Sequence, residues 1–156
     1  MTNIIGTYNC KADAKGRVAL PASLKSQLAP MINDGFVIKH SMFLDCLELH
    51  PLQEYNAMMM KIKRKGGFNR KYVKVLRRFV SGAQPVNIDD SGRLQIPKDL
   101  VGFAGITKEV VLTATIDVIE IWDKDKYNAD LKEGEEDYPD LLEEVLDGDG
   151  NDESIS

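Results

Sequence analysis

Residues 13–21 read DAKGRVALP and residues 89–97 read DDSGRLQIP. Aspartate, glycine, arginine and proline recur at matching places, and the residues between arginine and proline alternate similarly. A turn dipeptide ending in glycine, flanked by alternating apolar residues, indicates a β-hairpin. The proline then ends the second strand and suits the first turn of a short helix. Each stretch therefore predicts a hairpin followed by a helix.

The repeat continues downstream of these stretches. Residues 43–55, FLDCLELHPLQEY, align with residues 115–127, TIDVIEIWDKDKY. The spacing between the copies changes from 76 to 72 residues, so one connection differs by four. CLELH and VIEIW alternate with the period of a half-buried strand. The sequence thus predicts a β-β-α-β-β unit that occurs twice. The helices would face the core through Leu24 and Leu28 in the first copy, and through Leu100 and Ala104 in the second.

Each unit of about 45 residues is too small to bury a stable core alone, so the two must pack together. We expect a mainly β protein with short helices (α+β). Its predicted parts are a first unit at 7–54, a basic helical linker at 55–82, a second unit at 83–126 and an acidic, partly disordered tail at 127–156. Gly66-Gly67 is expected to split the linker into two helices, with Met58, Ile62, Val73, Leu76 and Val80 as candidates for its apolar contacts.

Composition narrows the class of protein. The chain has 156 residues, 43% hydrophobic and 29% charged, as in a soluble globular domain. No window approaches 18 uncharged apolar residues, and the first residues lack the pattern of a signal peptide. Two cysteines are too few for a disulfide scaffold. These features predict a cytoplasmic protein that has no membrane partner.

Charge is unevenly distributed along the chain. Residues 123–156 contain fourteen acidic residues and three lysines, whereas residues 1–122 contain eleven acidic and seventeen basic residues. A basic body favours a polyanionic partner, with which an acidic tail would compete. The alternative is a solubilising tail on a domain that is close to neutral.

The doubled D-x-x-x-R pattern, with GITKEVVL at 105–112 and IEIWD at 119–123, closely resembles the MraZ family over roughly residues 4–128. Members are bacterial transcriptional regulators made of two SpoVT/AbrB-type units. The resemblance implies an AbrB/MazE-like swapped-hairpin double-split β-barrel, formed as an intramolecular pseudo-dimer. It also implies ring-like homo-oligomers in the nucleoid. They would bind direct repeats in double-stranded DNA upstream of the division and cell-wall gene cluster, including the protein's own promoter.

The hairpin loops are the first candidate DNA-binding site. By resemblance Arg17 contacts DNA, and Arg93 is its repeat counterpart. A guanidinium can hold phosphate or the edge of guanine through two hydrogen bonds. Lys11 and Lys15 add charge to the first loop, whereas the second has Asp90 and Ser91. The expected turn-forming and orienting residues are Asp13, Gly16, Asp89 and Gly92. The alternative is that aspartate and arginine only pair to fix each turn.

The linker is the second candidate, because residues 61–78 hold nine Lys and Arg and no acid. Such a cluster attracts phosphate regardless of sequence. Alternatively, it is a solvated helix face or a surface that meets the acidic edge of a neighbouring subunit.

Other chemistry has little support in the sequence. His40, Cys46 and His50 span ten residues with a predicted bend between them, so we expect no metal site. No phosphate loop or hydrolase motif occurs, so we expect no cofactor, no small-molecule substrate and no enzyme. The predicted function is a sequence-specific DNA-binding transcriptional regulator. The alternative is a protein-interaction module of antitoxin type, whose acidic tail engages a protein partner.

Overall fold

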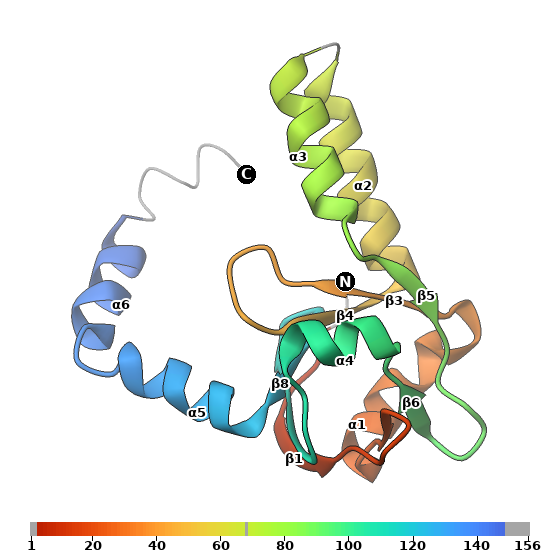
Figure 1. Ribbon diagram of the computed structural model, residues 1–156. Coiled ribbons are helices and arrows are strands. Elements are labelled where there is room, and N and C mark those ends of the chain that lie inside the picture. The colour runs from red at the N-terminus through yellow and green to blue at the C-terminus, as the bar shows by residue number, and fades with distance from the viewer. Residues whose placement is uncertain (1–2, 68, 149–156) are drawn as a thin grey trace. The chain divides into compact units, whose positions relative to one another are not determined.

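The computed structural model describes residues 3–67 and 69–148. The chain forms two compact units, Met1–Lys124 and Asp125–Ser156 (Figure 1). Within the described ranges, no helix is long and apolar enough to cross a membrane. The first unit contains strands β1 (Thr7–Lys11), β2 (Arg17–Ala19), β3 (Phe36–His40), β4 (Leu47–Pro51), β5 (Gln84–Val86), β6 (Arg93–Gln95), β7 (Glu109–Thr115) and β8 (Val118–Asp123), and helices α1 (Ala22–Leu28), η1 (Ala29–Asp34), α2 (Leu52–Gly66), α3 (Arg70–Val80) and α4 (Lys98–Ala104).

The predicted duplication is confirmed, and the protein is mainly sheet with short helices. The order β1-β2-α1-β3-β4 recurs as β5-β6-α4-β7-β8. The 3-10 helix η1 lies between α1 and β3, whereas α4 ends at Gly105 in a left-handed conformation, shortly before β7 begins. The strand registers place two of the four residues in this connection, because Ile38 and Leu112 are equivalent at a spacing of 74. The other two lie in the loop between β3 and β4, so the prediction that one connection differs by four is wrong.

The two copies exchange their first strands. The six-stranded sheet has the order β1-β7-β8-β4-β3-β5, so β1 of the first copy pairs with β7 of the second. In return, β5 of the second copy pairs with β3 of the first. All these pairings are antiparallel. The exchange is the one that a swapped-hairpin pseudo-dimer requires, and it makes each half incomplete without the other.

Repeat counterparts meet at two places. Glu48 of β4 is opposite Glu120 of β8, and Val18 of β2 is opposite Leu94 of β6. A pair of equivalent residues can be opposite each other only where a two-fold relation passes between them. A pseudo-two-fold axis therefore passes through both pairs and relates the two hairpins.

One hydrophobic core serves both copies. Val18 and Leu94 are fully buried in it. The helix residues predicted to face the core do so, since Leu24, Leu28, Leu100 and Ala104 are all at most 1% exposed. Each fully buried leucine contributes about 1.5–3 kcal/mol to stability. Trp122 is also buried. One face of β2 and β6 packs on the core through Val18 and Leu94, and the other face lies outside the core.

Helices α2 and α3 form an arm that follows β4 (Figure 1). Its buried residue is Phe79, rather than the apolar candidates named from sequence, of which Met58 and Val73 are exposed. The Phe79 ring stacks on Tyr55 with centroids 5.8 Å apart, and Nζ of buried Lys39 lies 4.7 Å from the Phe79 centroid. The arm is therefore anchored at its base, by the last turn of α3.

The second unit contains helix α6 (Tyr138–Asp147) and nearly all of α5 (Lys124–Glu133). Much of the predicted acidic tail at 127–156 is thus helical. Residues 149–156, the end of the tail that is predicted to be partly disordered, lie outside the described residues. The apolar side chains of α6 are exposed.

Candidate nucleic-acid interface

The first hairpin turn is organised by Asp13. Its Oδ1 accepts hydrogen bonds from the backbone N–H groups of Lys15 (2.9 Å) and Arg17 (3.0 Å), and its Oδ2 accepts one from Arg17 Nε (2.7 Å). The backbone N–H of Arg17 is the main cause that lowers the Asp13 pKa below its ordinary value. Asp13 is therefore ionised at neutral pH and fixes both the turn and the direction of the arginine.

The second turn repeats this arrangement. Asp89 Oδ1 accepts from the N–H groups of Ser91 (2.9 Å) and Arg93 (2.9 Å), and Oδ2 accepts from Arg93 Nε (3.1 Å). The Asp89 pKa is lowered by the same leading cause, the Arg93 N–H. Asp89 therefore holds the second turn and Arg93 through the same three hydrogen bonds.

Gly16 and Gly92 allow each turn to form and to hydrogen-bond to the opposite hairpin. Their φ angles are 80° and 78°, a conformation that strains other L-residues. The Gly16 carbonyl accepts from Ile96 N–H (2.8 Å), and the Gly92 carbonyl accepts from Leu20 N–H (2.9 Å). Each turn is thus hydrogen-bonded to the chain that follows the opposite hairpin.

Strands β2 and β6 form a two-stranded antiparallel ribbon over the core. Arg17 is opposite Gln95, and Ala19 is opposite Arg93. These four residues alternate with the buried Val18 and Leu94, so they share the outer face. The two arginines were predicted from the sequence, whereas Ala19 and Gln95 were not. The period of two in RVA and RLQ is the signal that would have found them.

The ribbon presents two guanidinium groups that are partly oriented in advance. The Arg17 and Arg93 side chains are 33% and 40% exposed. Among the described residues, both guanidinium groups form their hydrogen bonds through Nε, which leaves the terminal Nη atoms for another acceptor. A two-stranded ribbon fits the major groove of DNA, where arginine recognises guanine. The arrangement is suited to contact with a nucleic-acid groove.

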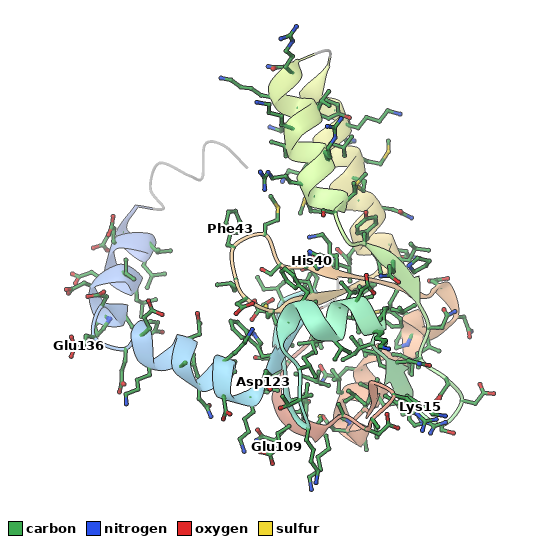
Figure 2. All side chains as sticks on the ribbon, viewed as in Figure 1. Lys15, His40, Phe43, Glu109, Asp123 and Glu136 are labelled. Carbon is green, nitrogen blue, oxygen red and sulfur yellow. The ribbon has the colours of Figure 1, made fainter. Side chains whose placement is uncertain are left out.

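Lysines make the first hairpin more basic than the second. Lys15 lies exposed at the turn between β1 and β2 (Figure 2). Together with Lys98 of α4, which was not predicted from the sequence, it lines a groove beside the turn. Lys11, at the end of β1, is opposite Glu109. Glu109 Oε2 lies 3.9 Å from Lys124 Nζ, with which it forms an ion pair.

The basic arm forms a separate candidate surface. Figure 1 shows α2 and α3 at the opposite end of the first unit from β6. Met58, Ile62, Tyr72 and Val75 line a groove between the two helices, together with Lys61, Lys65 and Lys71. The hairpins and the arm therefore do not form one continuous site.

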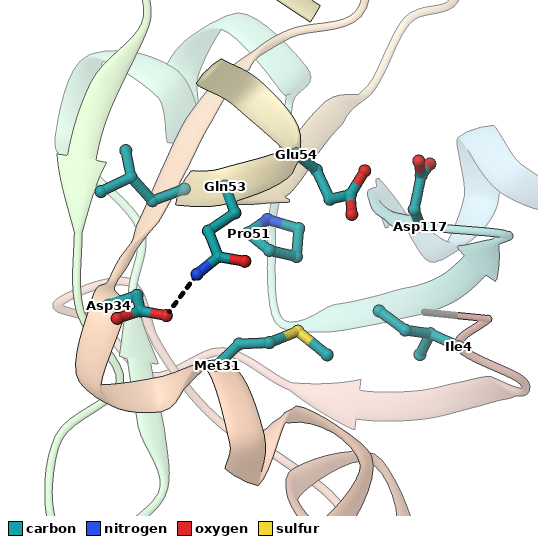
Figure 3. A pocket seen from close by; sticks show the side chains of 8 residues that line it. Ile4, Met31, Asp34, Pro51, Gln53, Glu54 and Asp117 are labelled. Carbon is teal, nitrogen blue, oxygen red and sulfur yellow. Dashed lines mark hydrogen bonds between the residues drawn. The ribbon is translucent and has the colours of Figure 1, made fainter. Parts of the chain in front are cut away.

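A third hollow lies near the start of α2 (Figure 3). Asp34, Glu54 and Asp117 line it, and Gln53 Nε2 donates to Asp34 Oδ2 (3.1 Å). Three carboxylates make this hollow unfavourable for phosphate, so it is not part of the candidate interface.

The three residues considered for a metal do not converge. His40 stacks on Phe103 with centroids 3.7 Å apart, and His50 Nε2 is hydrogen-bonded to Glu48 (3.0 Å). Cys46 is buried before β4. Within the parts of the chain that the structure describes, no group of three or more His, Cys, Asp or Glu residues could hold a metal ion.

Comparison with known proteins gives consistent results along the chain. The family model described as "MraZ protein, putative antitoxin-like" matches residues 4–77 and 79–147. A protein of Christiangramia forsetii named transcriptional regulator MraZ is 53% identical over 153 residues, which cover 98% of this chain and 97% of that protein. The protein of the same name from Flavobacterium psychrophilum is 46% identical over the same shares of both chains. That of Bifidobacterium longum is 36% identical and covers 92% of each.

Proposed function

The chain belongs to the MraZ family, and on this basis we propose that it is a DNA-binding transcriptional regulator rather than an enzyme. The relatives are named transcriptional regulators, which supports the general class. The DNA contact is assigned to the outer face of the β2–β6 ribbon and to the first hairpin. Arg17 is the main contact, with Lys11 and Lys15 beside it and Arg93 as its counterpart.

The observation that carries this assignment is the orientation of Arg17 by Asp13. A guanidinium held through Nε at 2.7 Å keeps its fork directed while its terminal groups stay available. Pre-orientation reduces the side-chain entropy that is lost on binding. Lys15 and Lys11 add phosphate attraction at the same hairpin. By contrast, a purely structural ion pair would not require lysines beside it.

The operator arrangement follows from symmetry. The pseudo-two-fold axis lies within one chain, so further assembly would use surfaces that differ from each other, and such contacts make rings when their rotation closes. Ring neighbours present the first hairpin in one rotational sense. We therefore infer direct repeats spaced by about one helical turn, roughly 10 base pairs. The sites would lie upstream of the division and cell-wall gene cluster, including the protein's own promoter. The protein would therefore be located in the cytoplasm, at the nucleoid.

The test is a gel-shift experiment with the purified protein and its own upstream DNA. We expect binding to direct repeats that weakens when half a turn is inserted between them. Strong binding to a single inverted repeat, or indifference to the insertion, would contradict the operator arrangement. Failure to bind any upstream repeat would contradict the function and favour the antitoxin-type interaction module.

A further inference from the structure

Helix α6 separates apolar and acidic side chains onto opposite faces. Tyr138, Leu141, Leu142, Val145 and Leu146 follow the i, i+3, i+4, i+7, i+8 pattern of a single apolar stripe. All five are between 41% and 64% exposed. The acidic residues Asp140, Glu143, Glu144 and Asp147 lie on the opposite face of the helix, which has no basic residue. A ten-residue helix of this kind gains most of its stability from packing its stripe against a partner.

The α2–α3 arm has the complementary surface. No residue of α2 is buried, and Met58 and Val75 in the groove are 43% and 48% exposed. The groove is closed near its end where the Tyr72 ring lies against Gly66, at a place that a Cβ atom would occupy. Its floor is apolar and its lysines are Lys61, Lys65 and Lys71. The groove therefore combines an apolar floor with basic edges, which suits a helix that has an apolar face and acidic flanks.

We propose that α6 of one copy lies in the α2–α3 groove of a second copy and forms a three-helix contact. Apolar stripe would meet apolar floor, and acidic flanks would meet the lysines. Recognition of an amphipathic helix by a groove through i, i+3, i+4, i+7 anchors is a general mode of association. Opposite charges at the edges steer the encounter and fix the orientation.

This contact deepens the self-association proposed above and rests on it. The two surfaces differ, so the contact is heterologous, and one copy offers both halves of it. Each copy can therefore accept one neighbour and be accepted by another, which gives a closed ring when the rotation between neighbours closes. In the assembly, α6 would cover part of the basic arm and leave the hairpins for DNA.

The first experiment uses full-length charge variants and light scattering over a range of concentrations. We expect Lys61→Glu with Lys65→Glu to raise the concentration for half-assembly by about tenfold or more, and Glu143→Lys with Glu144→Lys to do the same. Combining all four changes should restore assembly in part. The matched control, Lys63→Glu with Lys74→Glu, makes the same charge change on the arm, with one residue on α2 and one on α3, outside the groove lining, and should assemble like wild type.

A mixing experiment tests whether two copies are involved. One variant keeps the groove but has a weakened helix face, Leu141→Ser with Val145→Ser. The other keeps the helix but has the Lys61→Glu, Lys65→Glu groove. Each alone should stay monomeric, and the mixture should form a one-to-one complex that grows no further. Circular dichroism checks that both variants remain folded.

The outcomes separate this contact from the function. If wild type assembles and both surface variants assemble equally well, the contact is wrong while self-association stands. If wild type is monomeric at every concentration, both the contact and the ring are wrong. If the variants disassemble but do not pair when mixed, α6 does not act between copies. DNA binding, measured separately by gel shift, decides the regulator function in each case.

Discussion

The two hairpins of this protein share a framework but differ in charge. In both, a glycine adopts positive φ and an aspartate accepts three hydrogen bonds, one of which the arginine Nε donates. Between aspartate and glycine, however, the first turn has Ala14 and Lys15, whereas the second has Asp90 and Ser91.

This comparison separates what the fold requires from what the proposed function requires. The features present twice are those that make the turn and clasp the opposite hairpin. Those present once change the potential of the surface without changing the hydrogen bonds. We therefore expect stability to respond to changes in either hairpin, and DNA affinity to respond mainly to the first.

The largest difference is expected for the arginines. Arg17→Ala should abolish specific DNA binding, because a bidentate base contact is worth about 1–3 kcal/mol in each copy and assembly multiplies the loss. Arg93→Ala should weaken binding less, since Asp90 lowers the potential there. Gel shift measures both, and circular dichroism serves as the control for folding. Equal losses from the two variants would remove the functional difference between the hairpins.

The glycines test the shared framework. Alanine at either Gly16 or Gly92 must take a left-handed conformation, which costs about 1–2 kcal/mol. A Cβ at Gly16 would lie 2.8 Å from the Ile96 carbonyl oxygen, whereas one at Gly92 would meet the flexible Lys25 side chain at 3.0 Å. Gly16→Ala should therefore be the more destabilising change in thermal unfolding. The opposite order would mean that the backbone at the Ile96 carbonyl moves away more easily than the Lys25 side chain does.

The lysine and serine at the turn tips provide an exchange experiment. Lys15→Ser should reduce the slope of log affinity against log salt by about 0.9, the value for one phosphate contact. Ser91→Lys should change that slope little if the second turn lies away from phosphate. The slope is measured by fluorescence anisotropy at several salt concentrations. An equal and opposite change from Ser91→Lys would show that both turns reach the DNA.

The aspartates should give the smallest effect, and the same one in both hairpins. Their pKa values are lowered in the folded state, so their contribution to stability is complete above the unfolded value of about 3.9. It is lost as the pH falls through the lowered folded value. Asp13→Asn and Asp89→Asn should each flatten this acid dependence in denaturant unfolding. A difference between the two variants would contradict the shared framework.

Internal comparison of the sequence predicted the repeated unit, the turns and the core positions of α1 and α4. These features depend on local patterns that each copy displays separately. The position of Phe79 was missed, because which face of an amphipathic helix is buried depends on where the rest of the chain meets it. Lys98 was missed for a similar reason. It is distant in sequence from Lys15, and the two line one groove only because the first turn is hydrogen-bonded to the chain that follows the second hairpin.

The exchanged strand β1 also affects the order in which the molecule can be made. Thr7 pairs with Thr113, and their side-chain hydroxyls are 2.9 Å apart across a separation of 106 residues. On the ribosome, the first strand leaves the tunnel long before its partner has been synthesised. Until β7 emerges, the first half exposes an unpaired edge that other nascent chains can bind. Contacts this distant in sequence also slow folding. The duplication places both halves of a dimer-like interface in one chain. As a result, β1 stays unpaired until most of the chain has been translated.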